Sequence, residues 1–209
     1  MNKKTRVTAQ RHAFAAFILA ALLTTSSVAL SAAATGEFHA PEIPADARLP
    51  KNFRLTDANG KTRVLADWRG KVVALFFGYT QCPDACPTGL ARAAQAVRLL
   101  GTAGKEVQVI FVTLDPMRDT PAVLREYPIA FHPDFLGLFA PPAQTPAVAR
   151  AFRVFYRVNP GATPQTYTLD HGVQTYVYDK KGKPRLAISH AASAEEMAED
   201  LRTLLAEKD

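Results

Sequence analysis

Two nearly continuous apolar runs constrain the fold of this chain more than any other feature. Residues 71–77 and residues 107–114 are each long enough for one strand. Between them, residues 90–100 carry apolar side chains at helical spacing. Strands that are apolar on both faces are typical of a parallel sheet covered by helices. The order of these three segments therefore predicts a parallel β-α-β unit.

The remaining segments predict how this unit is completed. An Asn-Gly turn separates two short strands near the start, and a Lys-rich turn separates two near the end. Two Thr-Pro pairs and a Ser followed by two glutamates are helix N-terminal signals. We expect strands at 53–56, 61–64, 135–139, 174–179 and 185–189, and helices at 120–131, 145–155 and 193–205. The sequence thus predicts an α/β fold: a thioredoxin-like sandwich with a central mixed sheet and an N-terminal β-hairpin.

The positive charge of the chain is concentrated at its N-terminus. The formal net charge is +6, but Lys3, Lys4, Arg6 and Arg11 precede every acidic residue. Removing these four from the 25 basic side chains leaves 21 against 19 acidic ones. No basic stripe with interleaved aromatic residues remains for a phosphate backbone, so the sequence argues against nucleic acid as a partner.

Residues 1–34 have the pattern of an export signal. Their basic residues flank an apolar run, residues 13–23, and small residues follow as far as Ala34. This order is typical of a secretory signal that is cleaved. The same stretch is also long enough to remain as a membrane anchor. We expect export by either route, a proline-containing linker at residues 35–52 and one domain at residues 53–209.

The chain has only two cysteines, Cys82 and Cys86, in the segment Gly78–Thr88 (Gly-Tyr-Thr-Gln-Cys-Pro-Asp-Ala-Cys-Pro-Thr). The segment follows the first apolar run, at the strand end where α/β proteins carry their functional side chains. A disulfide between residues four apart would close a very short loop and stabilise little. In an exported protein, such a pair indicates a functional role.

Pro87 indicates where the following helix begins. Proline is tolerated in the first helical turn, so the helix should begin between Asp84 and Cys86, with Asp84 as the candidate N-cap. Cys86 then lies in the first turn and Cys82 on the preceding loop. The positive end of the helix favours thiolates there, so we expect reactive sulfurs. The spacing suits a thiol–disulfide pair, or two ligands for Cu(I) or Zn(II) that need a third.

Three segments of the chain together resemble the Sco/SenC family of copper-binding proteins. The first is Gly78–Thr88, which contains C-P-x-x-C-P, and the second is Phe111–Pro121, which contains D-P-x-R-D-T. The third is Tyr167–Gly172, which contains an Asp-His pair. Gly172 departs from the family pattern, in which serine is common, but it adjoins a ligand position and does not occupy one. The resemblance extends over residues 50–207.

The resemblance implies a copper site and a role in assembling an oxidase. Carried over residue by residue, the ligands of Cu(I) and Cu(II) are Cys82, Cys86 and His171, and the two cysteines also form a redox-active disulfide. The family is tethered to a membrane and serves the binuclear copper centre of cytochrome c oxidase. This implies a metal-binding protein, not an enzyme, on the periplasmic side of the inner membrane. Its partners would be the copper-accepting subunit of the oxidase and another copper chaperone as donor.

A second interpretation of the same residues stays open. A thiol–disulfide oxidoreductase that reduces the cysteines of the oxidase copper site would use Cys82 and Cys86 but would not need His171. A peroxidase-like thiol enzyme is disfavoured by the second cysteine and by the lack of a clear arginine beside Cys82. His171 therefore discriminates between copper carriage and dithiol exchange.

Without the resemblance, the case for His171 is weaker. We expect this histidine on a loop before a strand, with the Asp170 carboxylate orienting its ring. Of the other four histidines, His12 and His39 fall in the signal and the linker, His132 at a helix end, and His190, after the last strand, should be exposed.

Two further carboxylates are candidates for positions around the site. Asp84 either caps the helix or attracts the cation. Asp115 ends the second apolar strand, beside the cysteine loop, where an Asp-Pro turn is the simpler explanation. Arg118 and Asp119 are expected to pair across the same turn.

Overall fold

The computed structural model describes residues 37–163 and 165–207. The segment expected to be a signal or an anchor, residues 1–34, lies outside the described residues. None of the described helices combines the length and the hydropathy that a membrane crossing requires.

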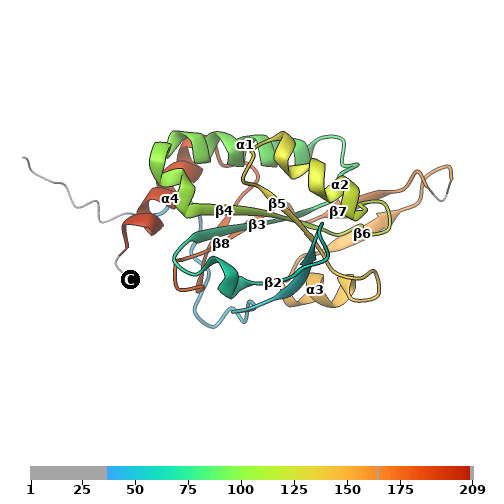
Figure 1. Ribbon diagram of the computed structural model, residues 1–209, viewed down its shortest axis with the longest axis horizontal. Helices are drawn as coiled ribbons and strands as arrows, with labels where there is room; N and C mark the ends of the chain where they lie inside the picture. Colours follow the sequence, from blue (N-terminus) through green and yellow to red (C-terminus); the bar gives the residue numbers. More distant parts are fainter. Residues whose placement is uncertain (1–36, 164, 208–209) are drawn as a thin grey trace, which may run out of the picture. The chain divides into compact units, whose positions relative to one another are not determined.

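A seven-stranded mixed sheet forms the centre of the fold (Figure 1), in the order β2-β1-β5-β4-β3-β8-β9. Strands β3, β4 and β5 run parallel, whereas β1, β8 and β9 pair antiparallel with their neighbours. The seven strands are β1 (Arg54–Asp57), β2 (Thr62–Val64), β3 (Val72–Gly78), β4 (Val107–Thr113), β5 (Leu136–Phe139), β8 (Thr175–Tyr178) and β9 (Pro184–Ile188). The predicted central mixed sheet and N-terminal hairpin are therefore confirmed.

Helices cover both faces of this sheet, which confirms the predicted thioredoxin-like sandwich. The four α-helices are α1 (Ala85–Leu99), α2 (Pro121–Glu126), α3 (Thr145–Ala151) and α4 (Ala194–Ala206). Figure 1 shows α1, α2 and α4 on one face and α3 on the other. Helices α2 and α3 are shorter than the sequence indicates. Pro128 has no N–H to donate to the carbonyl of Leu124, so α2 ends and a short 3-10 turn follows.

The β3–α1 connection places the cysteine segment because both elements are anchored in the core. All seven residues of β3 are buried, and the strand is paired with β4 on one side and β8 on the other. Helix α1 approaches the sheet closely at Gly89, where a Cβ would lie 2.8 Å from the ring of Phe76. The carboxyl end of β3 and the start of α1 are thus held in place by apolar packing.

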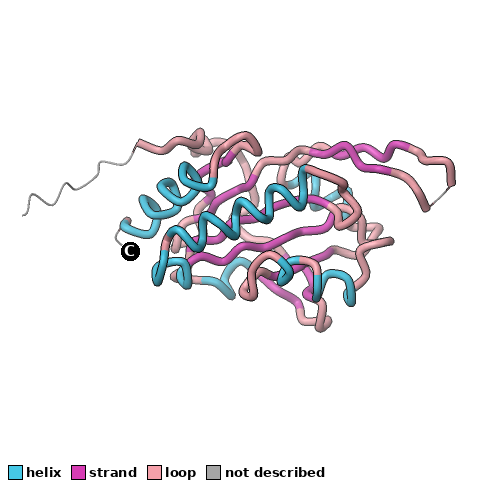
Figure 2. The backbone as a smooth tube through the Cα atoms, turned by 90° about the horizontal axis from the view of Figure 1, so that it is seen from above, coloured by secondary structure: helices cyan, strands magenta, loops and turns pink. Residues whose placement is uncertain are grey.

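A second, two-stranded sheet follows α3 and was not predicted. Strand β6 (Tyr156–Asn159) pairs antiparallel with β7 (Thr168–His171). The hairpin extends beyond the central sheet in both Figure 1 and Figure 2. Most of its side chains are at least partly exposed, so the apolar pattern that marks buried strands is missing from these residues.

The segment expected as a linker, residues 35–52, makes specific contacts with the domain over its described part. The amide of Ile43 donates to the carbonyl of Arg185, and the amide of Ala187 donates to the carbonyl of Pro41. Ala40 and Leu49 are buried in the hydrophobic core. This segment therefore lies along the edge strand β9 and protects its backbone groups.

Candidate metal centre

The two cysteines lie where the end of β3 meets the start of α1. Asp84 occupies the N-cap position of α1, Cys86 lies in the first turn with Pro87, and Cys82 lies on the preceding loop. The geometry predicted from Pro87 is thus found. The amide of Cys86 donates to Sγ of Cys82 at 3.4 Å, so a free N–H of the helix start contacts the first sulfur.

His171 reaches the cysteines from the second sheet. It is the last residue of β7, opposite Tyr156 on β6, and not part of a loop as expected. The ligand atoms of Cys82, Cys86 and His171 all lie within 4.8 Å of one another, and Nε2 of His171 lies 3.3 Å from Sγ of Cys86. The fold therefore brings together three side chains that are up to 89 residues apart in the sequence.

The hydrogen bonds of His171 leave one ring nitrogen free to act as a ligand. Nδ1 lies 2.9 Å from the carbonyl oxygen of Gly172. A carbonyl only accepts, so Nδ1 carries the proton and donates it. Nε2 is then the unprotonated nitrogen, and its lone pair faces the sulfur of Cys86. A histidine that donates its other N–H to a carbonyl is the usual arrangement for a metal ligand.

Burial favours the neutral forms of both the Cys86 thiol and the His171 imidazole. Cys86 is 0% exposed, and burial raises the pKa of its thiol well above the ordinary value. The expectation that both sulfurs are reactive is therefore wrong for Cys86, because desolvation of the thiolate outweighs the helix macrodipole. Burial also lowers the pKa of His171, which keeps the imidazole neutral. Both sulfurs are free in this structure.

The residues around the site pack closely against its ligands. A Cβ at Gly78 would lie 2.6 Å from Sγ of Cys86, so only glycine fits beneath the second sulfur. The buried ring of Tyr79 meets the ring of His171 edge-on, with centroids 5.8 Å apart. Tyr79 thus packs directly against the imidazole and fixes the side from which it approaches the sulfurs.

The three carboxylates expected around the site, Asp84, Asp115 and Asp170, differ in burial and in their partners. Asp84 is exposed and accepts a hydrogen bond from Thr88, and its side chain makes no capping bond. Asp170, expected to orient His171, instead forms an exposed ion pair with Arg157. The carbonyl of Gly172 takes that role, because successive residues of a strand point to opposite faces.

Asp115 is buried and belongs to a network that joins two parts of the site. Nε of Arg118 donates to it at 2.5 Å, and the hydroxyl of Tyr167 donates to it at 2.7 Å. The guanidinium of Arg118 stacks on the ring of Tyr167 and donates to that residue's carbonyl. The turn after β4 is thereby fastened to the hairpin that carries His171.

The sequence analysis did not anticipate this network. Arg118 pairs with Asp115 and not, as expected, with Asp119. Asp119 instead accepts hydrogen bonds from Thr80 and Thr113. The only signal for these contacts was the D-P-x-R-D-T segment, whose charged residues follow a buried strand.

The donor set fits copper. Two thiolates suit Cu(I), and a neutral imidazole adds the nitrogen that Cu(II) also accepts. A structural zinc site is closed by four protein ligands. Among the described residues, the group of three formed by Cys82, Cys86 and His171 is the one arrangement of cysteine, histidine and carboxylate ligands close enough to hold an ion.

Comparisons with known proteins agree with this site. The chain is 39% identical over 157 residues to a bovine protein, "Protein SCO2 homolog, mitochondrial"; the match covers 74% of this chain and 59% of the relative's length. The Bradyrhizobium japonicum ScoI structure with copper bound superposes with a TM-score of 0.67 at 36% identity, covering 74% of this chain and 98% of that chain. The apo Sco1 protein from Thermus thermophilus gives a TM-score of 0.71 at 38% identity, covering 82% and 99%. The SCO1/SenC family model matches residues 41–206, and the chain therefore belongs to the SCO1/SenC family.

Proposed function

We propose that this protein binds copper through Cys82, Cys86 and His171 and delivers it for assembly of the binuclear copper centre of cytochrome c oxidase. The main support for this proposal is that the three ligand atoms lie within 4.8 Å of one another, with Nε2 of His171 left unprotonated. Similarity to a ScoI protein whose structure holds copper supports the choice of metal.

Both oxidation states of copper are accommodated by this donor set. Cu(I) is held by the two thiolates, with or without the imidazole, whereas Cu(II) uses all three ligands. Binding displaces the thiol protons, because only the thiolate is a ligand. At Cys86, bound copper also offsets the cost of burying a thiolate, because the metal supplies the compensating positive charge.

The two sulfurs differ in access, which suits a carrier. Cys82 is partly exposed on its loop, whereas Cys86 is fully buried. A thiolate or imidazole of the acceptor therefore reaches the metal from the side of Cys82. Copper then moves by stepwise exchange of ligands, and Cys86 is the last protein ligand released.

A second function, favoured by two adjacent free thiols, is reduction of the acceptor's cysteines. In this reaction Cys82 and Cys86 close a disulfide while a disulfide of the oxidase subunit opens, so two electrons and two protons pass to the acceptor. The high pKa of Cys86 makes Cys82 the better attacking thiol. His171 has no part in this exchange.

We place this activity on the periplasmic side of the inner membrane, with residues 1–34 as a cleaved signal or an anchor. The copper-accepting oxidase subunit is the proposed recipient, and another copper chaperone is the proposed donor. The pattern of basic, apolar and small residues in the sequence supports export.

An anaerobic copper titration of the wild type and of His171→Ala tests the proposal. We expect the wild type to bind one Cu(I), and one Cu(II) with thiolate-to-copper charge-transfer absorption. His171→Ala should keep Cu(I) but lose that Cu(II) spectrum, while Asp170→Asn should keep both. An unchanged Cu(II) spectrum in His171→Ala would show that the three-ligand site is wrong. Rapid turnover of disulfide substrates that copper does not affect would favour the oxidoreductase.

A further inference from the structure

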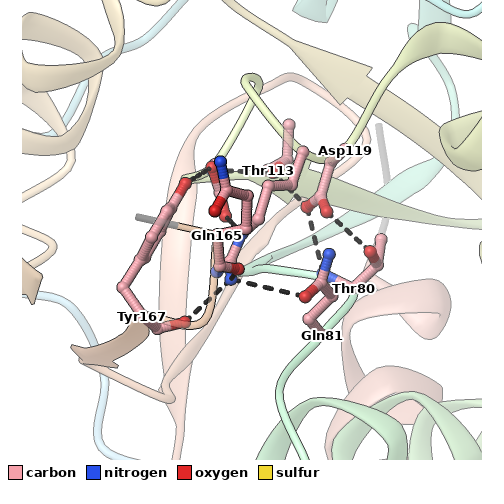
Figure 3. Close-up of polar contacts among 8 residues, drawn as sticks. Thr80, Gln81, Thr113, Asp119, Gln165 and Tyr167 are labelled. Carbon is pink, nitrogen blue, oxygen red and sulfur yellow. Dashed lines mark hydrogen bonds and ion pairs between the residues drawn. The ribbon is translucent and has the colours of Figure 1, made fainter. Parts of the chain in front are cut away.

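Asp119, between β4 and α2, is a buried carboxylate that contacts the cysteine loop. It is 1% exposed. One oxygen accepts from the amide of Thr80 at 3.0 Å and from the hydroxyl of Thr113 at 2.5 Å, and the other accepts from the hydroxyl of Thr80 at 2.6 Å. Figure 3 shows these three residues converging on one another.

The direction of these hydrogen bonds indicates an ionised Asp119. The backbone amide of Thr80 can only donate. The Thr113 hydroxyl accepts from the amide of Asp115 at 2.8 Å, so its own proton is directed at Asp119. A carboxyl group surrounded by donors is best satisfied when it carries no proton. Burial raises the pKa of this carboxyl, and the hydrogen bonds from Thr113 and Thr80 oppose that shift.

No cation neutralises this carboxylate within the part of the chain that the structure describes. The neighbouring guanidinium of Arg118 is directed away, toward Asp115 and the carbonyl of Tyr167. The other ion pairs of the described residues involve Asp57, Asp170, Asp179 and four glutamates. Asp119 is therefore a buried negative charge held by neutral donors alone, an arrangement that is costly to stability.

Two features connect this charge with the metal centre. Thr80, held by both its amide and its hydroxyl, lies two residues before Cys82. Thr113, its other donor, pairs across β3 and β4 with Gly78, and a Cβ at Gly78 would lie only 2.6 Å from Sγ of Cys86. The carboxylate thus fastens the start of the cysteine loop, and through Thr113 it lies one residue pair away from the glycine beside the second sulfur.

We propose that Asp119 is a positioning residue for the cysteine loop and that its buried charge favours Cu(II) over Cu(I) in the site formed by Cys82, Cys86 and His171. The second half rests on the proposed copper site. A fixed negative charge stabilises the more positive of two oxidation states, and the low dielectric of the interior strengthens the effect. No polar contact joins Asp119 directly to any of the three ligands, so its influence on copper acts through the loop and through space.

The charge has a measurable consequence. In Asp119→Asn, we expect the ratio of Cu(II) to Cu(I) affinity to fall about tenfold. A tenfold change corresponds to a rise of about 59 mV in the one-electron reduction potential of bound copper. Thr113→Val removes the hydroxyl that donates to Asp119 and accepts from the amide of Asp115 but keeps the charge, so its ratio should stay within about twofold of the wild type.

The chain offers a matched control for loss of a buried carboxylate. Asp200, on α4, is also 1% exposed and accepts two backbone hydrogen bonds, from the amides of His39 and Ala40. It forms no hydrogen bond or ion pair with the cysteine loop or with His171. Asp200→Asn should therefore lower stability without changing the copper affinity ratio.

The experiment uses the purified full-length chain with each substitution. Competition titrations under anaerobic conditions give both copper affinities, and a redox titration gives the potential. Hydrogen exchange of the copper-free protein reports on residues 79–82. We expect faster exchange there in Asp119→Asn and, to a lesser degree, in Thr113→Val, but not in Asp200→Asn.

The electrostatic role and the positioning role of Asp119 can be refuted separately. An unchanged affinity ratio in Asp119→Asn, with the wild type binding copper, overturns the electrostatic role. Unchanged exchange at residues 79–82 overturns the positioning role, whether or not copper binds. A wild type that binds no copper contradicts the proposed function instead. Should Asp119→Asn fail to fold, Asp119→Ser, which also lacks the charge, is measured in its place.

Discussion

The metal centre has two halves that are built differently. The half with Cys82 and Cys86 follows β3, a strand that is buried along its whole length and paired on both sides. The half with His171 belongs to the β6–β7 hairpin, which is paired only with itself. On that hairpin Val158 is 50% exposed, and Phe155, the residue directly before β6, is 64% exposed.

The halves therefore depend on different interactions. Apolar packing holds the cysteine half, so the positions of its sulfurs are fixed by the core. Polar contacts hold the histidine half: the bond of Tyr167 to Asp115, the stacking of Arg118 and the bond from the amide of Gly172 to the carbonyl of Phe155. A rigid thiol pair and a peripheral imidazole suit a carrier that must bind tightly and then release a ligand.

Two glycines, one in each half, give the largest expected difference. Gly78→Ala places a Cβ 2.6 Å from Sγ of Cys86 in the central sheet, where neither can move far. We expect copper(I) affinity to fall about a hundredfold and stability to fall by about 1–3 kcal/mol. Gly172→Ala meets no atom closer than 4.0 Å and should change neither. Anaerobic titration and urea unfolding of both variants measure this; equal effects would contradict the division into two halves.

The halves should also respond to pH in opposite directions in the metal-free protein. Burial raises the pKa of Cys86 above its ordinary value of 9.0, so its contribution to stability is present below pH 9 and is lost as the pH rises further. The loss should approach about 1.4 kcal/mol per pH unit. Burial lowers the pKa of His171 below 6.5, so its contribution is present above pH 6.5 and is lost as the pH falls.

Unfolding free energies between pH 5 and pH 11 test this opposition. Cys86→Ala should flatten only the alkaline limb of the profile, and His171→Ala only the acid limb. If either substitution flattens both limbs, the groups that titrate lie elsewhere.

Tyr167→Phe should loosen the histidine half alone. It removes the hydroxyl that donates to Asp115 but keeps the ring under Arg118. Loss of one such bond to a charged partner costs about 1.5–3 kcal/mol at most, and less where the surroundings relax. We expect faster hydrogen exchange across residues 156–171 and about fivefold weaker Cu(II) binding. Exchange across residues 79–86 should stay as in the wild type; a matching increase there would mean that the halves are one unit.

The smallest expected effect is that of Asp170→Asn. The carboxylate forms an exposed ion pair with Arg157, and exposed pairs contribute little. Cu(II) affinity should therefore change by less than about twofold in an equilibrium titration. A larger loss would show that Asp170, and not the carbonyl of Gly172, orients the imidazole.

The difference between the halves also explains how well each was predicted. Apolar runs mark β3 and β4 in the sequence, and Pro87 limits where α1 can begin, so the place of the two cysteines followed from local rules. The hairpin with His171 has no such pattern, because its strands are largely exposed. Its histidine was singled out chiefly by resemblance to a family, and Asp170 was the wrong partner for the ring.

By itself, the sequence determined the order of the helices and of the central-sheet strands along the chain, the mixed α/β sandwich and the position of the thiol pair at a helix start, because apolar periodicity and proline act over a few residues. Only the tertiary structure decided that His171 closes the group, that burial raises the pKa of Cys86, and that Asp119 fastens the cysteine loop. These properties depend on contacts between segments distant in the chain. Desolvation and hydrogen bonding across such contacts exist only once the core has formed.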